Sequence, residues 1–392
     1  MAFKLLDGIK VLDFTRLLPG GYATLLLADL GAQVLKVEDL AQGDYIRDMG
    51  PKVTDGNSAY FWALNRNKES MRLNIKHREG QEIVRRLVKH YDVLVEGFRP
   101  GVMERLGLGY EGLKEFNPGL IYCSLTGYGA DGPYRSRAGH DINYISLAGI
   151  LGLTGPADAP PVIPGIQVAD MAGGGLPAAV GILAALVGRR STGRGQYIDV
   201  AMLDGAVSLM GLYLGARLAG GEKPARGKTS LGGGRVSYGV YRTRDDRFVS
   251  LGCVEPKFWE VFCRVAGRED LLDHRFSTDE TIFAVVREFF GTRTRDEIID
   301  LFQGADSCVE PVLDVDEVLT HPQVIHREMV LEISLPGESP VRTIGPPIKL
   351  PLAETRNDTL PPAAGEHTGK TLALLGFDEE TVISLRERGV VA

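Results

Sequence analysis

Hydrophobic and polar positions in the first half of the chain follow two alternating periods. Short apolar runs, typical of buried strands, lie at 9–14, 33–38, 92–96, from 120 and at 196–202. Segments with helical spacing separate them, at 22–31, 79–90, 141–150 and 171–190. Parallel strands need such crossovers, and strands buried on both faces give nearly continuous apolar runs. The pattern predicts an α/β fold with a parallel sheet covered by helices on both faces.

The second half of the chain changes pattern after residue 219. A helix expected at 203–219 has almost no polar face, so we expect it to be buried or to lie at a subunit interface. The polar, glycine-rich stretch 220–235 is the best linker candidate, and a β-hairpin around Asp245 and Asp246 follows it, with helices to about 330. A proline-rich stretch and a helix pair at 368–388 end the chain. We therefore expect a large domain over 1–219, a linker over 220–235, a smaller α+β domain over 236–330 and a return to the large domain over 331–392.

Composition and charge narrow the class of protein. Hydrophobic residues make up 44% and charged residues 24%, which is ordinary for a globular chain, and the net charge of −7 argues against nucleic-acid binding. No apolar run reaches the length of a membrane span, and the N-terminus lacks the layout of a signal peptide, so a cytoplasmic location is expected. The four cysteines have no C-x-x-C spacing, which speaks against a zinc or thioredoxin-type site.

Two positions stand out as acid/base candidates. His140 lies directly before an apolar helix and is followed by Asp141, although a His-Asp pair at a helix start is more often only a cap. Asp170 precedes Gly173–Gly175 at another helix start, where free N–H groups and glycines could serve a developing enolate oxygen. A capping aspartate explains Asp170 equally well.

Other residues are weaker candidates by themselves. Glu255 ends a β-run before a proline, where a glutamate is often just solvated. Several basic residues stand near predicted strand ends, where open α/β sheets bind ligands: Arg16, Lys36, Arg66, Lys76, Arg99 and Arg105. The phosphate-loop, dinucleotide-binding, zinc-protease and serine-hydrolase motifs are absent from the sequence. The residues alone predict an α/β enzyme with a set of acid/base candidates.

Several longer motifs carry a resemblance to a known superfamily. They are V-L-D-F-T-R-L-L-P-G-G-Y from 11, L-N-R-N-K-E-S-M-R-L-N-I-K at 64–76, D-V-L-V-E-G-F-R-P-G from 92, L-T-G-Y-G-A-D-G-P-Y at 125–134 and G-R-G-Q-Y-I-D-V-A-M-L-D-G at 193–205. Together they resemble the superfamily of class III CoA transferases and α-methylacyl-CoA racemases, over nearly the whole chain. The resemblance implies a Rossmann-like large domain, an inserted smaller domain and an interlocked homodimer.

Two further motifs resemble the racemase branch of this superfamily. They are G-H-D-I-N-Y at 139–144 and V-E-P-K-F at 254–258. The resemblance implies that His140 and Asp170 are the two bases, that Glu255 orients His140, and that Asp141 supports Asp170. The expected reaction is racemisation of 2-methylacyl-CoA thioesters through an enolate. The alternative is a CoA transferase that uses Asp170 as nucleophile.

The resemblance also implies a binding site for the CoA part of the substrate, with no metal and no further cofactor. The residues carried over to it are Arg16, Leu73, Asn74, Ile75, Lys76, Gly97, Phe98, Arg99, Arg105, Thr126, Gly127, Tyr128 and Gly129. The chain departs from the family pattern at Asp39, where many members have an arginine that contacts CoA phosphates. We expect Arg47 to compensate, or the phosphate to be held otherwise. Gly97 also replaces a common asparagine.

Overall fold

The computed structural model describes residues 4–53, 58–333, 340–353 and 359–392. The chain divides into two compact units. The first unit comprises Met1–Ala148, Ile166–Leu209 and Gln323–Ala392, and the second comprises Gly149–Gly165 and Met210–Pro322.

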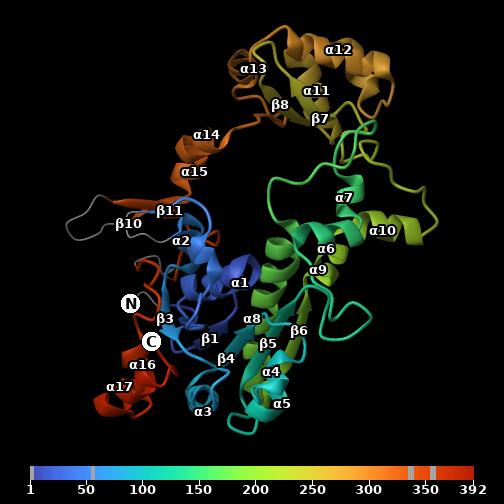
Figure 1. Cartoon of the computed structure of the whole chain (residues 1–392). Coiled ribbons are helices and arrows are strands. Elements are labelled where there is room, and N and C mark those ends of the chain that lie inside the picture. Colours follow the sequence, from blue (N-terminus) through green and yellow to red (C-terminus); the bar gives the residue numbers. More distant parts are fainter. Residues whose placement is uncertain (1–3, 54–57, 334–339, 354–358) are drawn as a thin grey trace. The chain divides into compact units, whose positions relative to one another are not determined.

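A six-stranded parallel sheet forms the centre of the first unit (Figure 1). Its order is β3-β2-β1-β4-β5-β6, the order of doubly wound α/β folds. The strands are β1 (Lys10–Phe14), β2 (Gln33–Glu38), β3 (Lys68–Arg72), β4 (Val93–Glu96), β5 (Ile121–Thr126) and β6 (Tyr197–Ala201). The predicted α/β fold with a parallel sheet is confirmed, and only β3 was not anticipated, because its sequence K-E-S-M-R is mostly polar.

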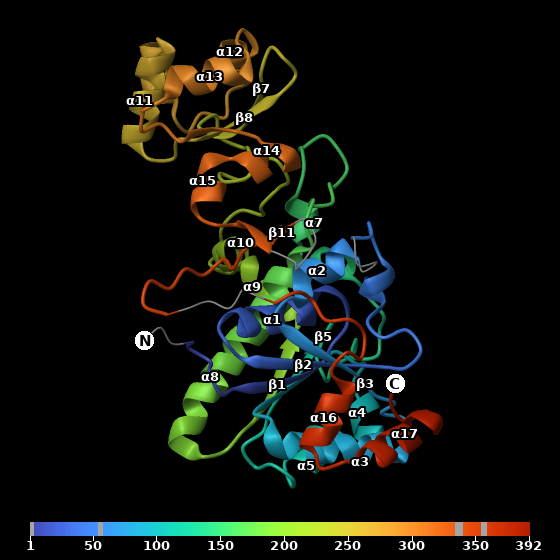
Figure 2. The ribbon, with the colours of Figure 1, turned by 90° about the vertical axis from the view of Figure 1, so that its left-hand side faces the viewer.

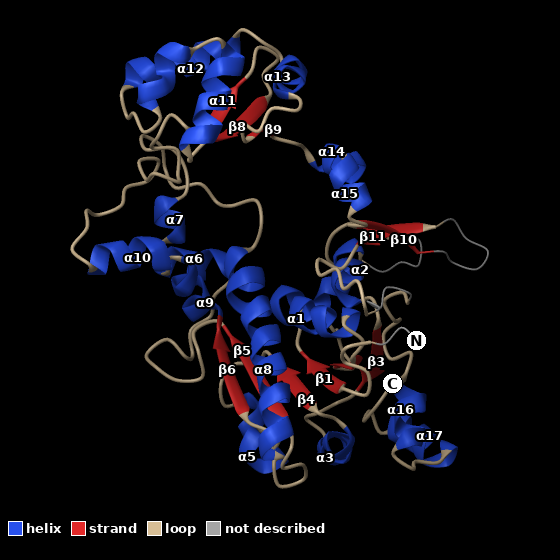
Figure 3. Cartoon of the chain, turned by 180° about the vertical axis from the view of Figure 1, so that it is seen from behind, coloured by secondary structure: helices blue, strands red, loops and turns tan. Residues whose placement is uncertain are grey.

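Helices cover both faces of this sheet (Figure 3). On one face α1 and α8 pack together and contact the strands, and on the other the core joins α3, α16 and α17 (Figure 2). The helices of this unit are α1 (Leu17–Asp29), α2 (Ala59–Asn65), α3 (Arg78–Leu87), α4 (Val102–Arg105), α5 (Tyr110–Leu113), α6 (Asp141–Leu147), α8 (Leu176–Thr192), α9 (Met202–Leu209), α15 (Pro322–His326), α16 (Thr368–Leu374) and α17 (Glu379–Glu387). Shorter elements are η1 (Tyr45–Asp48), η2 (Val88–His90), the π-helical η3 (Val168–Gly175) and the antiparallel pair β10 (Val330–Ile333) and β11 (Val341–Ile344).

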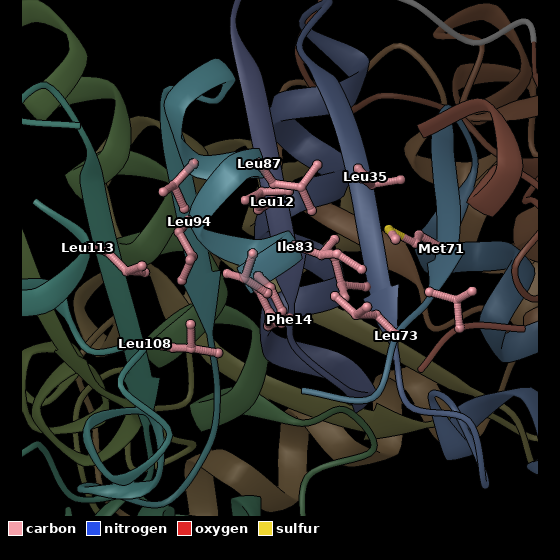
Figure 4. Packing of buried hydrophobic residues seen from close by; sticks show 14 of the residues in the cluster. Leu12, Phe14, Leu35, Met71, Leu73, Ile83, Leu87, Leu94, Leu108 and Leu113 are labelled. Atoms are coloured by element: carbon pink, nitrogen blue, oxygen red, sulfur yellow. The ribbon is translucent and has the colours of Figure 1, made fainter. Parts of the chain in front are cut away.

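A hydrophobic core lies on the α3 side of the sheet (Figure 4). Leu12, Leu35 and Leu94 come from three neighbouring strands and pack against Ile83 and Leu87 of α3. Each is at most 1% exposed, and burying such a side chain contributes about 1.5–3 kcal/mol. This packing fixes the strands and therefore the loops that leave their carboxyl ends.

The free edge of β3 is closed by the C-terminal segment. The Ser70 N–H donates to Nδ1 of His367 at 3.3 Å, and the Arg72 N–H donates to Oγ1 of Thr368 at 3.1 Å. A bridge between Leu73 and Val391 follows. The last residues of the chain therefore occupy the edge of a sheet that begins at residue 10.

The second unit contains a three-stranded antiparallel sheet of β7 (Tyr238–Arg242), β8 (Phe248–Gly252) and β9 (Val309–Pro311). Its helices are α7 (Ile150–Leu153), α10 (Gly211–Leu218), α11 (Pro256–Ala266), the 3₁₀ helix η4 (Glu269–His274), α12 (Glu280–Gly291), α13 (Arg295–Phe302) and α14 (Val315–Thr320). The predicted hairpin around Asp245 and Asp246 is confirmed, with Asp246 at a left-handed φ of 60°. The short β9 was not predicted. Trp259, Phe262 and Phe290 form the centre of this unit's core.

The single helix expected over 203–219 is wrong. The chain forms α9 and α10 with Met210 between them. Several apolar side chains of α10 are exposed in the single chain, among them Leu212 and Leu218. Burial within one chain therefore does not explain their apolar character.

One helix in the described part of the chain, Val168–Thr192, is long and apolar enough to cross a membrane by length and composition. It packs against β5, β6 and α1, and 44% of its apolar window is buried. A single helix of this kind is weak evidence for a membrane span.

Candidate functional site

A cavity of about 540 Å³ opens at the carboxyl ends of the strands in the first unit. Residues that follow β1, β4 and β5 form its floor, where the strand order reverses between β1 and β4. Open α/β sheets bind ligands at such switch points. The lining is Phe14, Thr15, Arg16, Leu17, Pro19, Gly20, Tyr45, Gly97, Phe98, Arg99, Pro100, Leu125, Thr126, Gly127, Tyr128, Arg135, Arg137, Ala138, Gly139, His140, Asn143, Tyr144, Asp170 and Met202.

His140 lies at the wall of this cavity, at the N-terminal cap position of α6. Its backbone is held from both sides by the first turn of the helix. The His140 N–H donates to Oδ1 of Asn143 at 3.0 Å, and the Tyr144 hydroxyl donates to the Gly139 carbonyl at 2.6 Å. The imidazole itself is exposed, so it can meet a ligand in the cavity.

Asp141 connects the His140 segment to Asp170. Its Oδ1 accepts hydrogen bonds from the Ala169 N–H at 2.6 Å and from the Asp170 N–H at 3.0 Å. The carboxylate of Asp141 therefore does not cap its own helix, as a local interpretation suggests, but holds the start of η3. Asp170 is brought into the same cavity as His140.

The carboxyl group of Asp170 has an unusual proton affinity. Burial, and then the nearby Asp141 carboxylate, raise its pKa to about 6, while His140 acts in the opposite direction. A group with this pKa exchanges protons near neutral pH, and histidine is the side chain that most often acts as a general acid or base in enzymes. The cavity thus brings together two side chains that can each take up and release a proton.

A cluster of three tyrosine rings precedes and follows His140 in the sequence, and two of them, Tyr128 and Tyr144, line the cavity. The ring of Tyr128 meets those of Tyr134 and Tyr144 edge to face, with centroids 5.5 and 5.1 Å apart. Gly127 leaves the space for this cluster, since a β-carbon there would lie 2.5 Å from the Tyr144 hydroxyl oxygen. The glycine therefore keeps Tyr144 next to the backbone of His140.

Arg16 also lines the cavity. Its guanidinium forms an ion pair with Asp39 at 2.5 Å and lies 5.7 and 5.8 Å from the ring centroids of Tyr45 and Phe98. Partial burial opposes ionisation of Asp39, but backbone N–H groups and Arg16 lower its pKa below the usual value. Where many family members have an arginine, this chain has Asp39, and Asp39 orients another arginine, Arg16.

The expectation that Arg47 compensates for Asp39 is not supported. Arg47 is buried, and its guanidinium donates to both carboxylate oxygens of Glu38 at 2.7 and 2.8 Å. Arg135 and Arg137 do line the cavity, and sequence reasoning missed them. Their position just before the G-H-D-I-N-Y motif was the available signal.

The carried-over CoA residues fall into two groups. Seven line the cavity: Arg16, Gly97, Phe98, Arg99, Thr126, Gly127 and Tyr128. Leu73, Asn74, Ile75, Lys76, Arg105 and Gly129 lie outside its lining. Leu73 is buried in the core on the α3 side of the sheet, and the Gly129 N–H donates to Oγ1 of Thr126.

Contrary to the expectation from the sequence, Gly173–Gly175 do not lie where they could bind an enolate oxygen. All three are buried and lie outside the cavity lining. A β-carbon on Gly173 would lie 2.9 Å from the Met202 carbonyl oxygen, and one on Gly175 would lie 2.9 Å from the Pro19 carbonyl oxygen. These glycines let η3 pack closely on α9 and α1. The helix-start N–H of Asp170 is occupied by Asp141.

Glu255 belongs to the second unit. It is exposed at the N-terminal cap position of α11, followed by Pro256. Within the described residues, no group of three or more His, Cys, Asp or Glu side chains is placed to hold a metal ion.

Comparisons with known proteins identify the family to which this sequence and fold are similar. The sequence model of the family described as CoA-transferase family III matches residues 6–368. Human α-methylacyl-CoA racemase is 36% identical, over 98% of this chain and 97% of its own length. Human succinyl-CoA:glutarate CoA-transferase is 33% identical, over 99% and 90%. The crystal structure of a CaiB/BaiF family protein from Brucella suis is similar with a TM-score of 0.84 and 32% identity, over 96% of this chain and all of that one.

Proposed function

Because the chain belongs to CoA-transferase family III, we propose that it is a racemase that interconverts the two enantiomers of 2-methylacyl-CoA thioesters. The observation that carries this proposal is the meeting of His140 and Asp170 in one cavity. A transferase needs only the aspartate. A racemase needs a proton-transferring group on each face of a planar enolate, and these two side chains can supply them.

The proposed reaction is an exchange of the α-proton. One of the two groups removes the proton from C2 of the thioester, the electron pair moves into the enolate, and the other group returns a proton to the opposite face. His140 takes the proton from one enantiomer and Asp170 from the other. The raised pKa of Asp170, about 6, favours its role as a proton donor in the return step.

The CoA part of the substrate meets cationic groups in this proposal. Arg16, Arg99, Arg135 and Arg137 line the cavity, and Asp170 is the one carboxylate among its described lining residues. Arginine suits phosphate oxygens because its guanidinium offers several donors in a fixed plane. No cofactor beyond the CoA of the substrate enters the reaction.

A second copy of the chain is part of the proposal. Leu176, Val180 and Val187 are exposed on one stripe of α8, and Val180 and Val187 are 64% and 67% exposed. Exposed apolar stripes mark interaction surfaces. We therefore propose that this stripe contacts a second copy of the chain in a homodimer. The family resemblance adds to the proposal that the dimer is interlocked and that Glu255 orients His140. A cytoplasmic location also remains part of the proposal.

A CoA transferase with Asp170 as nucleophile is the second candidate. The similarity to succinyl-CoA:glutarate CoA-transferase favours it. In that reaction the Asp170 carboxylate attacks the thioester carbonyl, CoA leaves as a thiolate, and a mixed anhydride remains on Asp170. The thiolate then attacks the Asp170 carbonyl of the anhydride, which forms an aspartyl-CoA thioester and releases the first carboxylate. A second carboxylate attacks this thioester to form a new anhydride, and the thiolate attacks its acyl carbonyl, which gives the new CoA thioester and frees Asp170. His140 has no necessary part in this sequence.

Deuterium exchange separates the two reactions. A single enantiomer of a 2-methylacyl-CoA is incubated with the purified protein in D2O, without an added carboxylic acid, and C2 is followed by NMR. We expect deuterium at C2 together with loss of optical purity. The absence of exchange, combined with transfer of CoA to an added carboxylic acid, would overturn the racemase proposal and support the transferase.

A further inference from the structure

A fully buried ion pair lies beneath the loop between β1 and α1. Nζ of Lys36 is 2.7 Å from Oδ2 of Asp44, and both side chains are 0% exposed. Lys36 comes from the centre of β2, and Asp44 lies in the loop that follows β2. Neither residue lines the cavity, and neither has a part in the proposed reaction.

The ion pair holds the backbone on both sides of Arg16. Nζ of Lys36 donates to the Thr15 carbonyl at 2.8 Å. Oδ1 of Asp44 accepts from the Leu17 N–H at 3.0 Å. The residue between these two contacts is Arg16, whose guanidinium enters the cavity.

Leu17 adopts a backbone conformation that needs such support. Its φ is 61°, in the left-handed region that a residue with a β-carbon rarely occupies. Strained residues persist where surrounding contacts determine them, and they gather at functional sites. The hydrogen bond from Leu17 to Asp44 is a contact of this kind.

Stability alone gives a poor reason for burying the two charges. Removing an ion pair from water costs energy that its attraction often does not return, and apolar residues of similar size can stabilise a fold as well. Burial by itself would lower the pKa of Lys36, but the carboxylates of Asp13, Asp44 and Glu38 raise it above the ordinary value. Lys36 therefore stays charged at neutral pH.

We propose that the Lys36–Asp44 pair is a positioning device that fixes Arg16 for the phosphate-bearing part of a CoA ligand. The inference rests on the proposed binding of CoA in this cavity, but it does not need the racemase reaction. The pair sets the direction of Arg16 through the two backbone contacts, and Asp39, Tyr45 and Phe98 then hold the guanidinium.

A double-mutant cycle tests this coupling. CoA itself is titrated calorimetrically into the wild-type protein, Arg16→Ala, Asp44→Asn and the double variant. Loss of one arginine–phosphate contact weakens binding about tenfold to hundredfold. We expect Asp44→Asn to weaken binding nearly as much as Arg16→Ala does, and the double variant to be no more than about threefold weaker than Arg16→Ala alone.

The ion pair between Arg66 and Asp29 provides a matched control. It is also buried in the first unit, and neither residue lines the cavity. Asp29→Asn breaks a pair of the same kind, so we expect lower stability with CoA affinity within about twofold of wild type. If Asp44→Asn does not fold, Lys36→Met removes the donor to the Thr15 carbonyl while keeping a side chain of similar length, and it carries the same expectation of non-additivity.

Several results would overturn the inference. One is that the losses of CoA affinity in Asp44→Asn and Arg16→Ala add up in the double variant. Another is that Asp29→Asn loses as much CoA affinity as Asp44→Asn does. The inference is also wrong if Arg16→Ala binds CoA normally or if the wild-type protein does not bind CoA. A protein that binds CoA with the expected non-additivity, but shows no deuterium exchange, would support the positioning role and contradict the racemase proposal alone.

Discussion

Replacing Asp141 with asparagine removes one charge from the candidate site and leaves an oxygen in nearly the same place. In the structure, Oδ1 of Asp141 accepts two backbone hydrogen bonds, from Ala169 and Asp170. A hydrogen bond to a charged group contributes about 1.5–3 kcal/mol and a neutral one about 0.5–1.5 kcal/mol. The two weaker bonds should therefore cost the asparagine variant about 1 kcal/mol each, or about 2 kcal/mol together, in the free energy of unfolding. Relief of the repulsion between the carboxylates of Asp141 and Asp170 offsets part of this loss relative to the wild type.

Asp141→Ala is the comparison that isolates the two bonds. Alanine leaves both N–H groups without this acceptor, at a cost of about 1–3 kcal/mol each. Both variants remove the same repulsion between Asp141 and Asp170, so that contribution cancels between them. We expect alanine to be about 2 kcal/mol less stable than asparagine in urea unfolding at pH 7. Equal stability of the two variants would refute the argument that the oxygen of residue 141 holds the start of η3.

The same substitution should move the pH dependence of the reaction. Asp170 acts as a base only when ionised, so exchange from the enantiomer that it serves should rise as the pH increases through about 6. The Asp141 carboxylate raises the pKa of Asp170, and its removal lowers that pKa. In Asp141→Asn the acidic limb should therefore move to lower pH, by about 0.5–1 unit. A limb that stays in place, or moves to higher pH, would contradict this reasoning.

Two further substitutions test the wall beside His140. Tyr144→Phe removes the 2.6 Å hydrogen bond to the Gly139 carbonyl, so we expect the free energy of unfolding to fall by about 1 kcal/mol. Deuterium exchange should slow mainly for the enantiomer from which His140 takes the proton. Equal slowing of both enantiomers would contradict a role of Tyr144 in positioning the histidine. Gly127→Ala places a β-carbon 2.5 Å from the Tyr144 hydroxyl oxygen, so we expect a loss of about 1–3 kcal/mol in the free energy of unfolding and at least tenfold slower exchange. Gly291→Ala is the control, because a β-carbon there has no atom within 4 Å, and it should leave exchange unchanged.

The sequence predicted the parallel sheet well because buried strands leave a direct signal. A short apolar run such as 92–96, with helical patterns before and after it, is typical of a parallel strand that is buried on both faces. Strand β3 was missed because Lys68 and Ser70 are buried through polar contacts, with Nζ of Lys68 bonded to Asn65 and Thr24 and Oγ of Ser70 bonded to Glu38. Burial of this kind depends on partners that are distant in sequence, and periodicity cannot show it.

The candidate site was predictable only in part. Local reasoning marked His140 and Asp170 as candidates, but it favoured a capping role for His140 and left Asp170 open. The family resemblance then assigned both residues to the reaction. The bonds from Ala169 and Asp170 to Asp141 cross 28 and 29 residues, so no local pattern contains them. The expected domain boundaries at 219, 235 and 330 stay a prediction, as do the roles of Glu255 and of the CoA residues.

The closure of the β3 edge has a consequence for how the chain is made. Ser70 finds its edge partner in His367, 297 residues later, so the sheet cannot be completed until the ribosome has released nearly the whole polypeptide. Until then an emerging chain exposes a row of unpaired backbone groups, which other strands can join. Nascent chains of this protein should therefore depend on chaperones more than their stability suggests, and truncations that remove the segment from 359 onward should aggregate during expression.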